Sequence, residues 1–281
     1  MRTSPWTRRE MLKTMAIAAA AAGLPTLAHA ETLHGTAINH VSYSSAHFLE
    51  TRDFYTNLFG FQVSDADNLQ LFLWAGDSLI SAKNTPRVPR PFIDHIGLTV
   101  DPWDPDAVKR ALQGRGFTPR VNPNDVHDPH HLSMFVRDPN GYNLQLGAPT
   151  LETKPAPVPS TAPLKAVAIN HISYQCADYR KTRDFYAGLL GVPVSHDDGQ
   201  QAYLWFGDAF MVVRNSPTGS AMPVIDHMAW TLADWDAHHV ASVLTQHGLE
   251  AKPDPAGLSV MTKDVNGYPL QLCSKDLEKR P

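Results

Sequence analysis

The sequence predicts an α+β fold made of two tandem domains, each built from two β-α-β-β-β modules. Three observations predict it. The chain repeats its own motifs at a nearly constant spacing, a proline-rich segment separates the two copies, and each copy divides again into two similar halves. Motifs that return in the same order and at the same spacing indicate a duplicated domain.

The repeat can be followed motif by motif. Residues 37–43 (AINHVSY) return at 168–174 (AINHISY), and residues 51–55 (TRDFY) return at 182–186, both 131 positions later. Further matched pairs follow in the same order: Trp74 with Trp205, Asp94-His95 with Asp226-His227, and Asn140-Gly141-Tyr142 with Asn266-Gly267-Tyr268. Within each copy the module histidines are about 55 residues apart, which divides every domain into two modules.

Residues 1–30 are typical of an export signal. Arg8-Arg9 stand ahead of a short run of small apolar residues, and Ala28-His29-Ala30 has the small-x-small pattern of a cleavage site. The paired arginines resemble a twin-arginine signal. Because the apolar run is too short to span a bilayer, we expect no membrane anchor after processing. The expected location is periplasmic or secreted, by twin-arginine export.

The segment between the copies contains prolines at positions 149, 155, 157, 159 and 163. Prolines at this density favour extended, semi-rigid chain and indicate a linker. We therefore expect the signal peptide at residues 1–30, the first domain at 35–148, the linker at 149–165 and the second domain at 166–276.

Composition argues against nucleic acid as a partner. Removing residues 1–30 takes away four basic residues and one acidic residue, so the formal charge moves from −4 to −7. An acidic chain without a lysine and arginine cluster is a poor match for nucleic acid.

The two cysteines, Cys176 and Cys273, cannot form a disulfide framework, and we expect both to be unpaired at strand ends. A small-molecule ligand or substrate is the expected partner, and homo-oligomerisation stays open.

Each module opens with a short, β-branched apolar segment around a histidine, at residues 38–43, 93–100, 169–174 and 225–232, which predicts a strand. A helix follows: residues 49–59 carry a one-sided apolar stripe, and residues 107–112 and 240–244 end before glycines. Shorter strands complete the modules, for example at residues 70–74, 79–82, 133–136 and 142–146.

These patterns together resemble the vicinal-oxygen-chelate superfamily. The resemblance rests on the strand histidine, on Thr-Arg-Asp-Phe-Tyr-x-x-Leu-x-Gly along the helix, and on Asp138-Pro139-Asn140-Gly141-Tyr142 before the last strand. The superfamily includes glyoxalase I, extradiol dioxygenases, bleomycin-resistance proteins and fosfomycin-modifying enzymes. The resemblance covers almost the whole chain after residue 30 and implies two tandem glyoxalase-like domains, each with a cupped sheet. Because this fold hosts many chemistries, it leaves the function open.

The resemblance also implies where a metal would bind. Metal ligands of the superfamily come from the first and last strands of a module, and these positions hold His40, His95 and Gln145 in the first domain and His171, His227 and Gln271 in the second. Glutamine replaces the usual glutamate, so we expect Fe²⁺, Mn²⁺ or Zn²⁺ to bind more weakly, with an anionic or chelating ligand completing the shell. In four-module dioxygenases the second domain usually carries the metal, which favours His171, His227 and Gln271.

The neighbours of these histidines give further expectations. Strict alternation along a strand predicts that Asp94 and Asp226 face away from the histidines that follow them. Lys83 and Arg214 occupy matched positions from which they can attract an anionic ligand. A loop of the first domain also carries His127, His130 and His131, which are candidates for a functional role.

Two classes of function remain open. The first is an exported, divalent-metal-dependent enzyme of dioxygenase, isomerase or lyase type that acts on a small oxygenated molecule. The second is a non-catalytic small-molecule-binding protein of the bleomycin-resistance type. In ring-cleaving dioxygenases of this superfamily, a histidine stands shortly before the second ligand strand and a tyrosine shortly before the last ligand. The residues before His227 and Gln271 include neither group. His196 and Tyr268 are the candidates to replace them. Glyoxalase chemistry would need a carboxylate base that glutamine removes. No catalytic residue is assigned, and the four matched histidines favour the enzyme.

Overall fold

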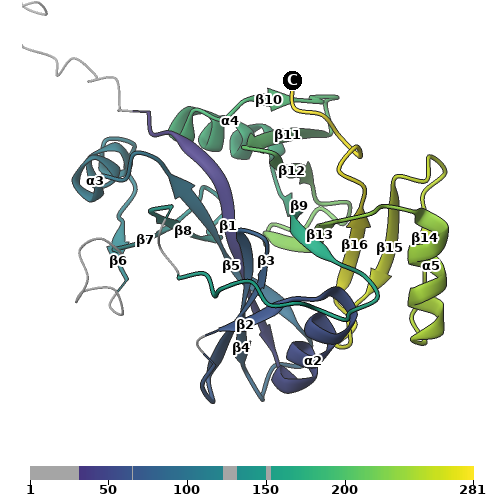
Figure 1. Cartoon of the computed structure of the whole chain (residues 1–281). Helices are drawn as coiled ribbons and strands as arrows, with labels where there is room; N and C mark the ends of the chain where they lie inside the picture. Colours follow the sequence, from purple (N-terminus) through teal and green to yellow (C-terminus); the bar gives the residue numbers. More distant parts are fainter. Residues whose placement is uncertain (1–31, 65, 123–131, 150–152) are drawn as a thin grey trace, which may run out of the picture.

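The computed structural model describes residues 32–281 apart from residues 65, 123–131 and 150–152. The expected signal segment and the loop histidines His127, His130 and His131 lie outside the described residues. The described chain forms two eight-stranded mixed sheets that are flanked by four helices (Figure 1). The expected α+β fold with two tandem domains, each of two β-α-β-β-β modules, is confirmed.

The first sheet is made by two modules that meet at its centre. The first module contains β1 (Gly35–Ser45), α2 (Phe48–Phe59), β2 (Gln62–Ser64), β3 (Gln70–Ala75) and β4 (Ser78–Asn84). The second contains β5 (Phe92–Val100), α3 (Pro105–Gln113), β6 (Arg120–Val121), β7 (Met134–Arg137) and β8 (Asn143–Gly147). The strand order is β2-β3-β4-β1-β5-β8-β7-β6, so the two first strands, β1 and β5, lie antiparallel at the middle.

The second sheet repeats this arrangement. Its modules are β9 (Ala166–Cys176), α4 (Tyr179–Leu190), β10 (Val194–Ser195), β11 (Gln201–Phe206) and β12 (Ala209–Asn215), then β13 (Val224–Leu232), α5 (Ala237–Gln246), β14 (Lys252–Pro253), β15 (Ser259–Lys263) and β16 (Pro269–Cys273). The strand order is β10-β11-β12-β9-β13-β16-β15-β14. The central strands β9 and β13 are again antiparallel.

The helices form where the sequence offers caps and apolar stripes. Asp104 accepts hydrogen bonds from the first-turn amides of α3, and Asp178 does the same for α4. Gly60 and Gly191 end α2 and α4 in the left-handed conformation, which glycine adopts without steric cost. Within the described residues, none of the helices has the length and apolarity needed to cross a membrane.

β-Bulges interrupt the central strands beside the module histidines. Asn39 is an extra residue in β1 where the pairing steps from Ile38 to His40, and Asp94 is an extra residue in β5 just before His95. Asn170 and Asp226 hold the same places in the second sheet. A bulge adds one residue to one strand and re-aims the neighbouring side chains. Simple in-and-out alternation therefore fails at these four positions.

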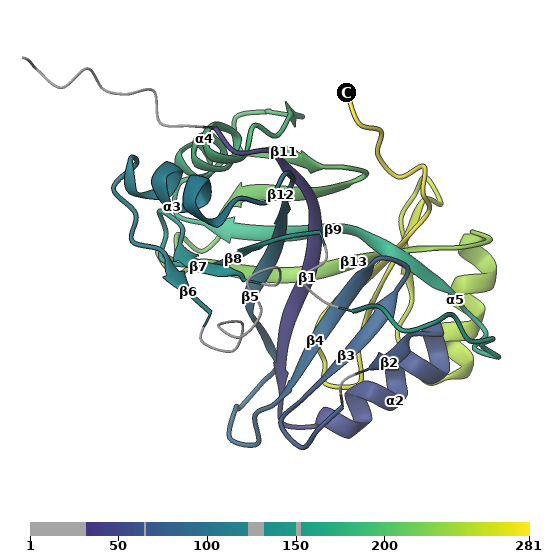
Figure 2. The ribbon, with the colours of Figure 1, turned by 60° about the vertical axis from the view of Figure 1, so that its left-hand side comes forward.

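The two domains share one continuous hydrophobic core. Its buried residues come from both sheets, and β1 contacts β11 and β12 while β3 and β4 contact β9 (Figure 2). The helices also pair across the domains: Phe117, after α3, packs on Phe185 of α4 with ring centroids 4.9 Å apart. Cys176 and Cys273, the last residues of β9 and β16, are both buried and are not paired with each other.

Matched hydrogen bonds also join the domains. Asp138, in the turn before β8, accepts from the hydroxyl of Tyr174 at 2.6 Å and from that of Tyr186 at 3.3 Å. The side-chain amide of Asn140 donates to Thr182 at 2.8 Å. In the second domain, Asp264 and Asn266 make the matching contacts with residues of the first domain, namely Tyr43, Tyr55 and Thr51. The Asp-x-Asn-Gly-Tyr motif of each domain thus binds the first strand and helix of the other.

Candidate metal centre

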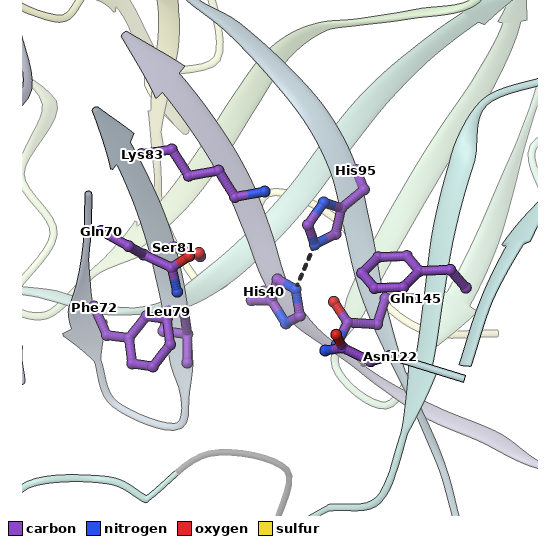
Figure 3. A pocket seen from close by; sticks show the side chains of 10 residues that line it. His40, Gln70, Phe72, Leu79, Ser81, Lys83, His95, Asn122 and Gln145 are labelled. Carbon is purple, nitrogen blue, oxygen red and sulfur yellow. Dashed lines mark hydrogen bonds between the residues drawn. The ribbon is translucent and has the colours of Figure 1, made fainter. Parts of the chain in front are cut away.

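The first candidate centre lies where β1, β5 and β8 run side by side. His40 of β1 and His95 of β5 are buried, and their Nε2 atoms face each other across 3.2 Å (Figure 3). Gln145 of β8 pairs in register with Gly97, and its side chain lies beside the His40 ring (Figure 3). Gly97 is required here, because an added Cβ would overlap the His40 ring. The structure therefore brings all three residues of the first set together.

The outer nitrogen of each imidazole is held by the residue before it. Nδ1 of His40 lies 2.8 Å from Oδ1 of Asn39, and Nδ1 of His95 lies 3.2 Å from Oδ1 of Asp94. The Asn39 oxygen accepts a hydrogen bond, so Nδ1 of His40 carries a proton and donates it, whereas Asp94 makes a close charge contact with His95. Nε2 of His40 is then unprotonated and shares a hydrogen bond with Nε2 of His95; without that hydrogen both atoms would face the same gap, as in histidines that ligate a metal.

The spacing of the two nitrogens fits a divalent cation. At a metal–nitrogen distance of about 2.1 Å, nitrogen atoms 3.2 Å apart subtend an angle of about 100° at the ion, between the octahedral and tetrahedral values. The Gln145 amide nitrogen donates to Ser133 at 2.8 Å, which leaves the carboxamide oxygen as a ligand atom. Among the described residues no group of three or more histidine, cysteine or acidic side chains is placed to hold a metal ion. The third ligand here is an uncharged amide.

Burial and charge keep His40 ready to bind a metal. Desolvation, together with the charges of His95 and Lys83, lowers the pKa of His40 to about 3, so its ring is neutral near pH 7. Burial alone would raise the pKa of Asp94, but its contact with His95 and the charge of Lys83 bring it well below its usual value. Nζ of Lys83 lies 3.0 Å from Asp94. An ionised carboxylate therefore stands directly behind His95.

A cavity of about 300 Å³ opens from this histidine pair. Besides the three candidate ligands, its walls are formed by Gln70, Phe72, Leu79, Ser81, Lys83, Asn122 and Phe135 (Figure 3). Two phenyl rings and several polar groups line the space, and none of these lining residues is acidic. Such a cavity is suited to a small, partly aromatic or apolar molecule with a few polar atoms.

The second domain repeats this arrangement of two histidines and a glutamine. Nε2 of His171 lies 3.1 Å from Nε2 of His227, and the Gln271 side chain is close enough to influence the pKa of His171. The outer nitrogens lie 2.8 Å from Asn170 and 3.4 Å from Asp226. Burial and the charge of His227 lower the pKa of His171 to about 3. Both predicted ligand sets therefore converge, each within its own domain.

The concave face around each histidine pair, called the first and the second cup, has different wall residues in the two domains. In place of Leu79, the second domain has Phe210, whose ring stacks on His171 with centroids 4.8 Å apart. Tyr203 stacks on Phe210 at 4.9 Å, so aromatic rings line this side of the second cup. The resemblance favoured the second domain as the active one. The cavity favours the first domain instead.

The prediction from strict alternation is wrong for Asp94 and Asp226. Because both are bulge residues, their carboxylates reach the Nδ1 atoms of the histidines that follow them. The sequence signal that could have revealed this role is the repetition of the Asn-His and Asp-His pairs in both domains.

The proposed substitutes for missing catalytic groups have other contacts. The hydroxyl of Tyr268 donates to the carbonyl of Ile225 at 2.6 Å, and burial raises the pKa of Tyr268 well above its usual value. His196 stacks on Tyr203 and forms an ion pair with Glu278. Neither geometry supplies an acid or base directed at the histidine pair.

Comparison with known protein sequences agrees with this picture. Residues 37–146, which include the first sheet's strands up to β8, match the Glyoxalase/Bleomycin resistance protein/Dioxygenase superfamily. The metallothiol transferase FosB of Staphylococcus haemolyticus is 24% identical over 123 residues, which cover 40% of this chain and 86% of that protein. FosB of Staphylococcus epidermidis matches to the same extent.

Solved structures resemble both domains together. The Mn(II)-bound glyoxalase from Novosphingobium aromaticivorans has a TM-score of 0.68 at 18% identity and covers 86% of this chain and 83% of its own. Homoprotocatechuate 2,3-dioxygenase from Arthrobacter globiformis has a TM-score of 0.69 at 13% identity, with coverages of 90% and 83%. The E323L mutant of the enzyme from Brevibacterium fuscum has a TM-score of 0.68 at 15% identity, with coverages of 87% and 73%. At these identities the likeness shows the fold alone.

Proposed function

We propose that this chain, which has the tandem fold of the vicinal-oxygen-chelate superfamily, is a divalent-metal-dependent enzyme that acts on a small oxygenated molecule in its first domain. The observation that carries the proposal is the pair of Nε2 atoms 3.2 Å apart at the base of a cavity of about 300 Å³. His40, His95 and Gln145 would hold Fe²⁺, Mn²⁺ or Zn²⁺. The names of similar proteins, a Mn(II)-bound glyoxalase and a metallothiol transferase, support metal dependence.

The donor set constrains the substrate. A bound divalent metal acts as a Lewis acid toward a ligand oxygen. Two imidazoles and a carboxamide bring no negative charge, so the substrate should supply an anionic or chelating oxygen. Phe72 and Phe135 would exclude water and contact the substrate's apolar part, while Ser81 and Gln70 would orient its polar atoms. The reaction we propose is of dioxygenase, isomerase or lyase type.

The test combines metal removal with one variant. A panel of small aromatic and aliphatic oxygenated acids is incubated with the native protein, and turnover is followed by mass spectrometry. Turnover should stop after chelation, return when metal is added, and be lost in His40→Ala. The exposed His239 on α5 provides the control, because His239→Ala should leave turnover unchanged. Turnover that persists in chelated protein and in His40→Ala would contradict the proposal.

A second function is favoured by one observation. None of the described residues that line the first cup is acidic, so no general base is evident there. This fits a protein that sequesters a small molecule without changing it, as bleomycin-resistance proteins do. In that case the bound molecule should be recovered chemically unchanged, and the affinity for it should survive metal removal.

We also propose that the protein is exported to the periplasm or secreted by the twin-arginine route. Support comes from Arg8-Arg9, the apolar run behind them and the small-x-small site ending at Ala30. The exported chain should begin at Glu31 by mass spectrometry. Replacing Arg8 and Arg9 together by lysine should leave an uncleaved chain inside the cell, and normal export of that variant would refute the assignment.

A further inference from the structure

A cavity of about 740 Å³ lies between the two domains, and none of the six candidate metal ligands lines it. The connection from β4 to β5 contributes Arg90 and Pro91, and the connection from β12 to β13 contributes Met222 and Pro223. Cavities that hold small molecules commonly enclose about 300 to 1,000 Å³. This interdomain cavity is therefore large enough for a small-molecule ligand.

Two walls of the interdomain cavity come from the same segment of the repeat. Residues 90–92 (RPF) and residues 222–224 (MPV) are 132 positions apart, which is also the spacing of the two Asp-His pairs. The two copies differ in chemistry, because Arg90 and Met222 hold the equivalent position. The cavity therefore combines a cationic wall from the first domain with an apolar wall from the second.

The apolar side chains of this cavity are exposed to water. Met222 is 78% exposed, Val224 42% and Phe92 40%. Single exposed apolar side chains are common on protein surfaces, but several that line one cavity form a patch of the kind that binds a ligand or partner. The buried residues Ile225 and Tyr268 continue the apolar surface inward. A molecule with an apolar body would remove this patch from water, which favours its binding.

The charged groups of the cavity favour an anion. Among the lining residues that the structure describes, Arg90 and Asp226 carry a charge. Asp226 forms an ion pair with Arg214, so its negative charge is compensated. The Arg90 guanidinium is exposed and has neither an ion pair nor a hydrogen bond with any described residue. Its planar set of N–H groups matches the two oxygen atoms of a carboxylate.

We propose that the interdomain cavity binds a small carboxylic acid with an apolar body, of the chemical class of short fatty acids. The carboxylate pairs with Arg90, and the apolar body packs on Phe92, Met222 and Val224. Binding is non-covalent, and no residue of the proposed metal centre takes part. The proposal therefore goes beyond the proposed function and does not depend on it.

The first test observes the cavity by NMR. The protein is labelled with [methyl-¹³C]methionine, and the Met222 signal is identified by its loss in Met222→Leu. Octanoate should shift this signal until it saturates. Arg90→Gln should weaken the affinity read from the signal by about 10-fold, because a charge-assisted hydrogen bond is lost. The control is Arg87→Gln, which changes an exposed arginine of the same connection that does not line the cavity and should leave the affinity unchanged.

The second test separates charge from apolar contact. 1-Octanol and octylammonium have the apolar chain of octanoate without its negative charge, so both should bind native protein about 10-fold more weakly. In Arg90→Gln, octanoate and 1-octanol should bind with equal affinity. Phe92→Ser should weaken octanoate and 1-octanol by the same factor, about 5-fold, because it removes apolar contact from both.

Three results would overturn the proposal. The first is a Met222 signal that does not respond to octanoate in folded native protein, and the second is octylammonium that binds as tightly as octanoate. The third is a Met222 signal that changes with protein concentration when octanoate is absent, which would assign the patch to contact between two copies of the chain. Because Met222 does not line the first cup, octanoate bound only at the metal centre would leave its signal unchanged. Failure here therefore leaves the proposed function standing.

Discussion

Each module histidine contacts the side chain of the residue before it. For His40 and His171 the neighbour is an asparagine, and for His95 and His227 it is an aspartate. Neutral imidazoles with fixed outer protons are what metal ligation requires, because only an unprotonated Nε2 can bind the ion. The consequence in metal-free protein is a stability that depends on pH.

The metal-free protein should lose stability as the pH falls from about 6.5 to about 3. His40 and His171 have pKa values lowered from 6.5 to about 3 in the folded state, so unfolding takes up protons at both residues in this window. Their stabilising contribution is therefore complete above pH 6.5 and is lost on acidification, with a slope of at most about 1.4 kcal/mol per pH unit for each histidine. Urea unfolding in the presence of a chelator, repeated between pH 7 and pH 4, measures it.

A control variant distinguishes the contribution of these histidines to the pH dependence of stability from that of ordinary carboxylates. A variant with both His40→Gln and His171→Gln removes the two groups and should show a clearly shallower dependence between pH 6.5 and pH 5. An identical slope in native and variant protein would show that the histidines take up no extra protons on unfolding.

Among the elements, the bulged central strands define the centre. A regular strand places neighbouring side chains on opposite faces, so Asp94 could not reach His95 without the extra residue. The bulge in β5 makes this contact possible and brings Lys83 of β4 to the same carboxylate. The bulges therefore supply a negative charge next to a ligand set that has none of its own.

Asp94→Asn tests the role of that charge. Amide and carboxylate have the same shape, so the fold should persist while metal affinity at the first centre falls by about 10- to 100-fold. Zn²⁺ titration in the His171→Ala background, followed by calorimetry, measures it. Asp53→Asn, on the exposed face of α2, is the matched control and should leave the affinity unchanged. Equal affinity in Asp94→Asn would show that the carboxylate charge does not act on the metal.

For the molecule as a whole, we expect the two domains to unfold as one unit. They share a hydrophobic core, and Asp138 and Asp264 carry matched hydrogen bonds across the boundary. The buried carboxyl of Asp138 receives the hydroxyl groups of Tyr174 and Tyr186. Removing the carboxyl leaves both hydroxyls without this acceptor in the interior, which costs more than the loss of a surface contact.

Asp138→Ala should lower the free energy of unfolding by about 3 kcal/mol or more, and Tyr174→Phe by about 1 kcal/mol. Asp77, which is 96% exposed in its ion pair with Lys154, provides the control, and Asp77→Ala should change stability by less than about 0.5 kcal/mol. Urea unfolding followed by circular dichroism should show one transition in every variant. Two separate transitions in the native protein would contradict the single core.

The sequence by itself determined the duplication, the four modules, and their helices and strands. These properties are carried by local periodicity and by repetition along the chain. His40, His95 and Gln145 could be named as a set because the resemblance places them on first and last strands, and the structure brings them together.

Only the tertiary structure decided how those residues are supported and which residues line each cup. The bulges at Asn39 and Asp94 arise from pairing between strands, which residue alternation cannot reveal. The difference between Leu79 and Phe210 is visible as letters, but their position over a histidine depends on the register between parallel strands far apart in sequence. Contacts of this kind depend on the pairing and packing of distant segments, so a linear pattern can locate the ligands but not the space around them.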